Sequence, residues 1–235
     1  NSVDQLSATT VQQIITADDA THKERLVQWL LSNEPHRKAM IFCNTRAQVD
    51  RLYGHLVALD YKAFVLHGEK DQKDRKLAID RFRQGGSKVL VATDVAARGL
   101  DIDDLDLVIN FDMPRSGDEY VHRIGRTGRA GASGLAISLI CHNDWNLMSS
   151  IERYLKQRFE RRVIKELKGS YQGPKNVKAS GKAVGVKKKK TDKKDGAKKS
   201  ASKAAPKRRA NAPKAAPLVS QDGMAPLKRK KPAAE

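Results

Sequence analysis

The sequence predicts an α/β fold in which a mostly parallel sheet is covered by helices on both faces. Short apolar runs rich in Val, Ile and Leu alternate along the chain with longer segments whose apolar residues recur at helical spacing. The short runs are continuously apolar, which is typical of strands buried on both faces. Alternation of such strands with helices favours parallel pairing through crossover helices.

The predicted strands are the short apolar runs, taken in chain order. They cover residues 11–16, 38–43, 62–67, 88–93, 105–111, 134–140 and 161–167. In a parallel sheet of this kind, ligand sites gather at the carboxyl ends of the strands. The residues that directly follow each strand are therefore the first candidates for function.

The predicted helices are the segments with apolar residues three or four positions apart. They cover residues 21–32, 46–59, 71–85 and 143–159, and residues 118–126 show a shorter helical pattern. The first helix opens with Thr21 and carries Glu24 three residues later, which predicts a capping box. The third is expected to stop at the glycine pair 85–86.

The positive charge is concentrated at one end of the chain. The net charge of +19 divides into +16 for residues 173–235, with 20 Lys and Arg against 4 Asp and Glu, and +3 for residues 1–172. No aromatic residue follows Tyr171. Such a composition cannot bury enough apolar surface to offset chain entropy. We therefore expect a linker end at 1–10, a folded domain at 11–172 and a disordered basic tail at 173–235.

Composition also limits the compartment. No apolar run approaches the roughly 18 residues of a membrane helix, and no signal peptide opens the chain, so we expect no membrane association. Cys43 and Cys141 lie in apolar runs and are predicted to be reduced, buried thiols. A cytoplasmic location is expected, in a bacterium rather than in the nucleus or nucleolus of a eukaryote. Because the chain begins at Asn1, it is expected to be a fragment or a processed product.

Five motifs occur in a fixed order along the predicted strands. They are MIFCNTR, LHGEKDQKDR, VATDVAARGLD, VINFD and HRIGRTGR. Together they resemble the C-terminal RecA-like domain of a DEAD-box RNA helicase over roughly residues 11–167. His122 at the start of the last motif favours the DEAD branch over the related DEAH branch, which usually has Gln. The resemblance implies a RecA-like fold, ATP with Mg²⁺, an RNA partner and a second RecA-like domain in the same protein.

The motif HRIGRTGR crowds three arginines into residues 122–129, and these repel one another unless an anion lies among them. A guanidinium fork suits phosphate geometry and stays charged. The resemblance implies that Arg126 and Arg129 act as arginine fingers at a γ-phosphate. It further implies that His122 couples the nucleotide site to the other domain. The alternative is a structural network of these arginines with Asp112, Asp118 and Glu119.

The motif VATDVAARGLD adds the rest of the nucleotide site. Gly99 permits close approach of the backbone to the nucleotide, and by resemblance Asp101 accepts a hydrogen bond from the ribose. For Asp94 we favour a structural role in holding a neighbouring loop. Arg98 could form either an ion pair within the domain or a ligand contact.

The predicted RNA contacts go to the phosphate backbone, which positions a protein without specifying sequence. Gly68 can offer its N–H with no side chain in the way, and Arg75 can make a charge-assisted bond to a phosphate. Asn44, Thr45 and Arg46 follow a strand and are predicted to do likewise, together with Gln72. The resemblance implies that Thr93 also contacts an RNA phosphate.

The chain contains no P-loop pattern of the form G-x-x-x-x-G-K-[ST] in its folded part, and no D-E-A-D sequence. In the family these belong to the first domain, so ATP and Mg²⁺ are expected to be held mainly there and the chain alone is expected to be inactive. The histidines show no metal-ligand spacing, so no metal site is predicted. The alternative function is a stand-alone, non-enzymatic RNA-binding module with a basic tail. Ribosomal particles and RNA-processing proteins are candidate partners.

Overall fold

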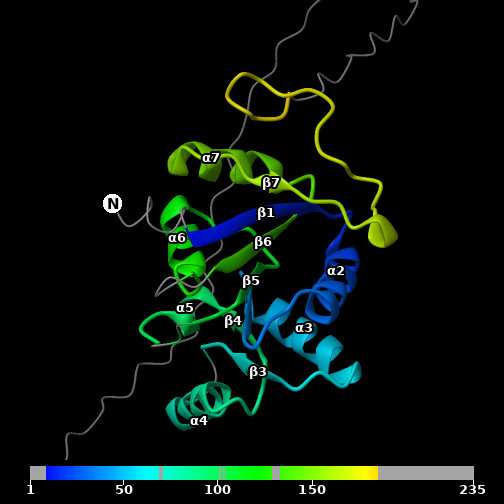
Figure 1. Ribbon diagram of the computed structural model, residues 1–235. Coiled ribbons are helices and arrows are strands. Elements are labelled where there is room, and N and C mark those ends of the chain that lie inside the picture. Colours follow the sequence, from blue (N-terminus) through cyan, green and yellow to red (C-terminus); the bar gives the residue numbers. More distant parts are fainter. Residues whose placement is uncertain (1–8, 69–70, 101, 103, 129–132, 185–235) are drawn as a thin grey trace, which may run out of the picture. The chain divides into compact units, whose positions relative to one another are not determined.

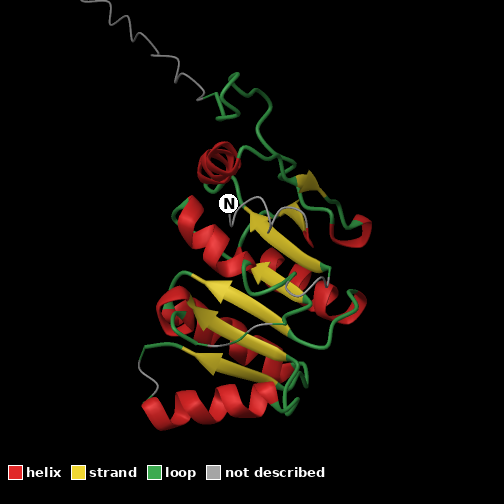
Figure 2. Cartoon of the chain, turned by 60° about the vertical axis from the view of Figure 1, so that its left-hand side comes forward, coloured by secondary structure: helices red, strands yellow, loops and turns green. Residues whose placement is uncertain are grey.

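Within the described residues, seven strands form a single parallel sheet in the order β3-β4-β2-β5-β6-β1-β7. The computed structural model describes residues 9–68, 71–100, 102, 104–128 and 133–184. The strand arrows run in one direction (Figure 2), so every carboxyl end lies at the same edge of the sheet. The predicted mostly parallel sheet is confirmed.

The element bounds agree closely with the predicted segments. The strands are β1 (Thr10–Thr16), β2 (Ala39–Cys43), β3 (Ala63–Leu66), β4 (Val89–Thr93), β5 (Leu107–Asn110), β6 (Gly134–Ile140) and β7 (Glu160–Arg161). The helices are α2 (Ala20–Asn33), α3 (Arg46–Ala58), α4 (Gln72–Arg83), α5 (Asp94–Ala97), α6 (Gly117–Ile124), α7 (Trp145–Leu155) and the 3₁₀ turn η1 (Lys165–Leu167). The short helix α5 was not predicted.

Alternation along each strand divides the core between the two faces of the sheet. In β2, Met40 and Phe42 belong to one buried cluster, whereas Ile41 and Cys43 belong to the other. Successive side chains of a strand point to opposite faces, so a continuously apolar strand needs cover on both. Helices α2 and α3 cover one face, and α4, α5, α6 and α7 cover the other. Figure 1 shows α2 and α3 to the right of the sheet and α5 and α6 to its left.

Three local predictions need correction. Helix α2 begins one residue before Thr21, because Asp19 rather than Thr21 caps it by accepting a hydrogen bond from the His22 N–H at 2.8 Å. Helix α7 ends at Leu155 because Lys156 adopts a left-handed conformation (φ 53°). The last predicted strand is only two residues long, since the chain then turns to bury Ile164 and form η1.

The two cysteines are free, as predicted, although only Cys43 is buried and Cys141 is half-buried. Burial raises the pKa of the Cys43 thiol well above its ordinary value. No helix in the described part of the chain is long and apolar enough to cross a membrane.

Residues 170–184, called the strap, contradict the predicted start of disorder at residue 173. The strap (yellow in Figure 1) is ordered against α7. Its first end is held where the Ser170 and Tyr171 N–H groups donate to the Asp18 carboxylate at 2.9 and 2.6 Å. These two bonds lower the pKa of Asp18. The boundary predicted from composition is therefore too early by at least 12 residues, and 185–235 lie outside the described residues.

The other end of the strap is a hairpin that uses Trp145 as its anchor. The Trp145 indole N–H donates to the Gly181 carbonyl at 3.1 Å, and the Ala183 N–H donates to Asn146 Oδ1 at 2.8 Å. The turn closes where the Gly181 N–H donates to the Lys178 carbonyl at 2.8 Å. Gly181 has φ +78°, as in a three-residue hairpin loop ending in a left-handed glycine.

We expect Gly181→Val to detach the hairpin. A β-branched residue is disfavoured at this φ, and its Cβ would lie 2.6 Å from Ser149 Oγ. Detachment exposes the Trp145 indole, so its fluorescence should shift to longer wavelength, measured in a Trp29→Phe background. The control Ala179→Val, at an exposed position of the same turn, should leave the emission unchanged. Unshifted emission of the Gly181 variant would show that the strap does not depend on this turn.

Candidate functional site

Arg123 is the centre of a buried polar network at the carboxyl edge of the sheet. Its side chain is 1% exposed, and its guanidinium donates from Nε and Nη2 to the two carboxylate oxygens of Asp94, both at 2.6 Å. It also donates to Asn44 Oδ1 at 2.8 Å, to the Asp112 carbonyl at 2.6 Å and to Asn110 Oδ1 at 3.2 Å. Arg123 is therefore neutralised and fully engaged within the domain.

The network joins the ends of three neighbouring strands. Asp94 follows β4, Asn44 follows β2, and Asn110 ends β5; these strands lie side by side in the sheet. Asp94 was predicted to hold a neighbouring loop, but it holds Arg123 of helix α6 instead. Sequence reasoning missed the burial of Arg123. The signal for it was present, because Arg123 follows Tyr120 by three residues on a helix whose buried face also holds Ile124.

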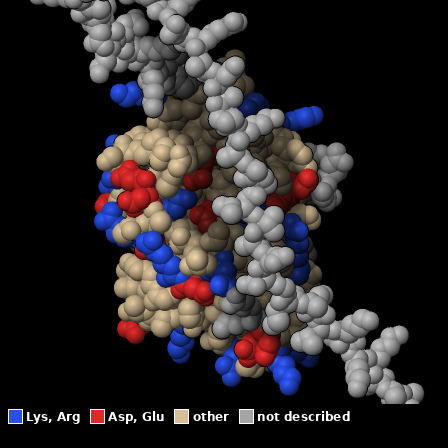
Figure 3. All heavy atoms as spheres, turned by 180° about the vertical axis from the view of Figure 1, so that it is seen from behind, with Lys and Arg blue, Asp and Glu red and all other residues tan. Residues whose placement is uncertain are grey.

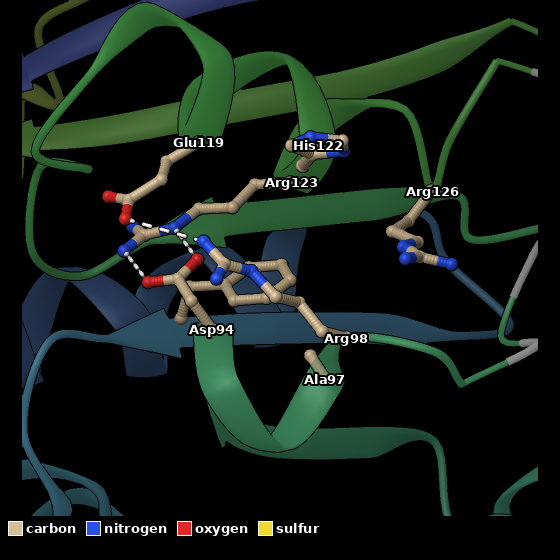
Figure 4. Close-up of a pocket in the computed structure, with 8 residues that line it drawn as sticks. Asp94, Ala97, Arg98, Glu119, His122, Arg123 and Arg126 are labelled. Carbon is tan, nitrogen blue, oxygen red and sulfur yellow. Dashed lines mark hydrogen bonds and ion pairs between the residues drawn. The ribbon is translucent and has the colours of Figure 1, made fainter.

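Beside this network lies a shallow hollow whose polar lining includes Arg98, His122 and Arg126. Figure 4 shows Arg123 directed to Asp94 and Arg98 directed to Glu119, while Arg126 lies apart from both pairs. The Arg98–Glu119 pair is loose, at 3.6 Å, and Arg98 is 62% exposed. His122 is exposed. The two arginines of the last motif that the structure describes thus differ: Arg123 is buried and structural, and Arg126 lies at the rim of the hollow.

Arg126 follows the end of α6 and reaches the loop after α5. Its Nη1 donates to the Leu100 carbonyl at 2.9 Å. Leu100 lies between Gly99, which has φ +71°, and Asp101, the predicted ribose ligand. The positive φ explains the need for glycine at position 99. Asp101 and Arg129 lie outside the described residues, so their predicted roles stay predictions.

Several predicted RNA-binding residues lie exposed after the carboxyl ends of β2 and β3. Gly68 is exposed and has open space where a Cβ would stand. Thr45 is exposed and accepts the Gln48 N–H at 3.2 Å, which caps α3. Arg46 and Gln72 are exposed in the first turns of α3 and α4. The sheet places all four at one edge.

Arg75 and Thr93 are brought together by α5. Arg75 Nη2 donates to the Ala96 carbonyl at 3.1 Å, and the Ala96 N–H donates to Thr93 Oγ1 at 3.4 Å. The Nε of Arg75 is buried and finds no hydrogen-bond partner among the described residues. A buried donor of this kind is costly unless an acceptor is supplied.

Asn44 is placed differently from the other predicted RNA contacts. Its side-chain amide donates to the Met113 carbonyl at 2.9 Å and accepts from Arg123. Its backbone N–H donates to Asp112 Oδ2 at 2.9 Å. Asn44 thus serves the internal network, and an RNA contact from this residue stays a prediction.

Acidic and basic side chains are interspersed over the face shown in Figure 3, so this face has no extended area of one sign. Among the residues that the structure describes, no group of three or more His, Cys, Asp or Glu side chains is arranged to hold a metal ion.

Comparison with known proteins identifies relatives of this chain. Residues 21–131 match the family model of the helicase conserved C-terminal domain. The chain is 45% identical over 158 residues to the ATP-dependent RNA helicase SrmB of Escherichia coli, which is 67% of this chain and 36% of that protein. It is 45% identical over 135 residues to the ATP-dependent RNA helicase RhlB of Aliivibrio fischeri, which is 57% of this chain and 31% of that protein. The chain thus spans about a third of the length of these relatives.

Solved structures of DEAD-box proteins also match this chain. A crystal structure of the E. coli DEAD-box protein SrmB bound to regulator of ribonuclease activity A matches with 43% identity and a TM-score of 0.68, covering 71% of this chain and 98% of that one. Saccharomyces cerevisiae Dbp5 bound to RNA and ADP BeF3 matches with 34% identity and a TM-score of 0.62, covering 65% of this chain and 41% of that one.

Proposed function

Because this chain belongs to the DEAD-box helicases, whose C-terminal helicase domain it forms, we propose that it supplies one half of a composite ATP site in an ATP-dependent RNA helicase. The proposal depends mainly on the different positions of two arginines within HRIGRTGR. Arg123 is paired with Asp94, whereas Arg126 lies at the rim of a hollow, beside the loop that leads to Asp101.

On the nucleotide side, Arg126 stabilises charge that develops on the γ-phosphate during transfer. Such a finger acts by electrostatic stabilisation of the transition state. Arg129 and Asp101 complete the proposal as second finger and ribose ligand. His122 faces the other domain, and Gly99 allows the backbone to approach the nucleotide. Carboxylates of the other domain would hold Mg²⁺, which would offset the negative charge of the phosphates.

On the RNA side, the exposed carboxyl edge near β2, β3 and β4 binds the phosphate backbone. Gly68 donates its N–H, and Arg75, whose guanidinium is held by the Ala96 carbonyl, donates from its remaining N–H groups. Thr45, Arg46, Gln72 and Thr93 line the same edge. Contacts of this type bind without reading bases. We propose RNA duplex unwinding or remodelling as the outcome, in the cytoplasm, with ribosomal particles or RNA-processing proteins as further partners.

The proposal is tested by measuring ATP hydrolysis with and without the other domain. The chain alone should hydrolyse no ATP above background, because its folded part carries no P-loop pattern to cradle the phosphates. Joined to a RecA-like domain that carries a P-loop and an Asp-Glu-Ala-Asp sequence, it should show hydrolysis stimulated by RNA. Robust turnover by the chain alone would contradict a composite site. RNA binding without stimulation by the joined protein would favour the non-enzymatic module.

A further inference from the structure

The last part of the described chain is far more basic than the rest. Residues 153–184 contain ten Lys and Arg and two Asp and Glu, whereas residues 1–152 contain 19 and 21. The body of the domain is therefore close to neutral, and its last described segment carries a net charge of +8. A concentration of one sign on one segment is the electrostatic footprint expected of a surface that binds a polyanion.

Much of this charge is uncompensated. Arg158 pairs with Glu152 at 2.9 Å, and Arg162 pairs with Glu34. Lys175, Lys178 and Lys182 of the strap are exposed and form no ion pair in the described structure. The Lys178 N–H donates to the Lys182 carbonyl at 2.8 Å, so these two lysines lie opposite each other across the hairpin.

Hydrogen bonds to the rest of the domain hold the backbone of the strap in place. Asp18 holds its first end, and Trp145 and Asn146 hold the hairpin. Arg161 lies over the Trp145 ring, with its Cζ 4.7 Å from the centroid, and keeps its charge at the same place. Because the backbone is already ordered, binding through these residues loses less conformational entropy than binding through a disordered segment.

The strap also lies along the edge that carries the proposed RNA contacts. Its anchors Asp18 and Trp145 follow the carboxyl ends of β1 and β6. Gly68 and Arg46 lie beyond the same ends of β3 and β2, Thr93 is the last residue of β4, and all of these strands are parallel members of one sheet. The strap therefore occupies the opposite end of this edge.

We propose that Lys175, Lys178 and Lys182 of the strap, with Arg161 beside them on Trp145, form a second phosphate-binding surface for RNA. This inference rests on the proposed function and lengthens its RNA path from β3 toward β7. Lysines act there as point charges on phosphates, so the surface adds affinity and footprint without sequence preference.

The test compares two charge-matched double variants of the whole 235-residue chain. Lys178→Gln with Lys182→Gln removes two charges from the strap. Lys62→Gln with Lys88→Gln removes two exposed charges next to the amino ends of β3 and β4, at the opposite edge. Binding of a fluorescent single-stranded oligouridylate is titrated over a range of salt concentrations. Unchanged Trp145 fluorescence shows that the strap is still attached.

The strap variant should bind RNA more weakly at low salt, with a slope of log K against log salt shallower by about 1.4, or about 0.7 for each phosphate that is no longer neutralised. The control variant should keep the slope of the unmodified chain. Equal slopes for all three proteins would overturn the inference while leaving the proposed function intact. The inference would also be overturned if the strap variant lost binding to poly-L-glutamate but bound RNA as the unmodified chain does. That result would favour an acidic protein partner. If the unmodified chain binds no RNA, the proposed RNA contacts fail together with this inference.

Discussion

Replacement of Arg123 by alanine should destabilise the domain by about 3–5 kcal/mol, because it removes one partner of a buried ion pair. The Asp94 carboxylate would lose both of its 2.6 Å bonds. The acceptors on Asn44, Asn110 and Asp112 would lose their donor at the same time. The measurement is urea denaturation followed by circular dichroism, with the free energy of unfolding taken from the midpoint and slope.

Arg98→Ala is the matched control for this prediction. Arg98 also pairs with a carboxylate, but it is 62% exposed and its nearest oxygen lies 3.6 Å away. Exposed pairs of this kind contribute about 0–1 kcal/mol. Arg123→Lys should fall between the two, since it keeps the charge but cannot grip both oxygens of Asp94 in a planar fork. Equal stabilities of the Arg98 and Arg123 variants would refute the structural role of Arg123.

Arg126→Ala should lower kcat for ATP hydrolysis by about 10³-fold in a protein that carries both helicase domains, within the range for an arginine finger. The loss of stability should be smaller than for Arg123→Ala, because the Arg126 side chain is only partly buried and one of its bonds goes to the neutral Leu100 carbonyl. RNA affinity without nucleotide should barely change. Steady-state ATPase assays with saturating RNA give kcat, and fluorescence anisotropy gives the RNA affinity.

Arg37→Ala serves as the control for Arg126, since Arg37 is 84% exposed and pairs with Asp106 away from the hollow. It should leave kcat unchanged. If Arg126→Ala abolishes RNA binding and spares hydrolysis, then Arg126 is an RNA ligand and its assignment to ATP is wrong.

The strands and helices could be predicted because the sheet is buried on both faces. Short, continuously apolar runs such as residues 39–43 are typical of strands buried on both faces. The order of the strands in the sheet could not be predicted, because no feature of one apolar run indicates which strand pairs with it. The helix ends also depend on single side chains, as the cap by Asp19 shows.

Within the site, the motif residues were identified but their division of labour was not. Arg123 and Arg126 look alike in the sequence. They differ only because α6 buries the first and ends before the second.

The strap was missed for a similar reason. Its composition resembles that of a disordered tail, and it has no apolar core of its own. What orders it is the Trp145 indole and the Asp18 carboxylate of the folded domain. Charge and hydropathy within a segment do not report such tertiary partners. A local sign was nonetheless present in the Ser180–Gly181 pair, which is a common turn signal.

Arg123 and Arg126 belong to one motif but serve different ends, and a paired measurement can separate their roles. The thermal unfolding midpoint and kcat are measured on the same preparations of Arg123→Ala and Arg126→Ala in the two-domain protein, at a temperature where both remain folded. This difference in roles predicts a large fall in the midpoint of this domain for Arg123→Ala and a smaller fall for Arg126→Ala, which instead loses about 10³-fold in kcat. A normal midpoint for Arg123→Ala, or a normal kcat for Arg126→Ala, would contradict it.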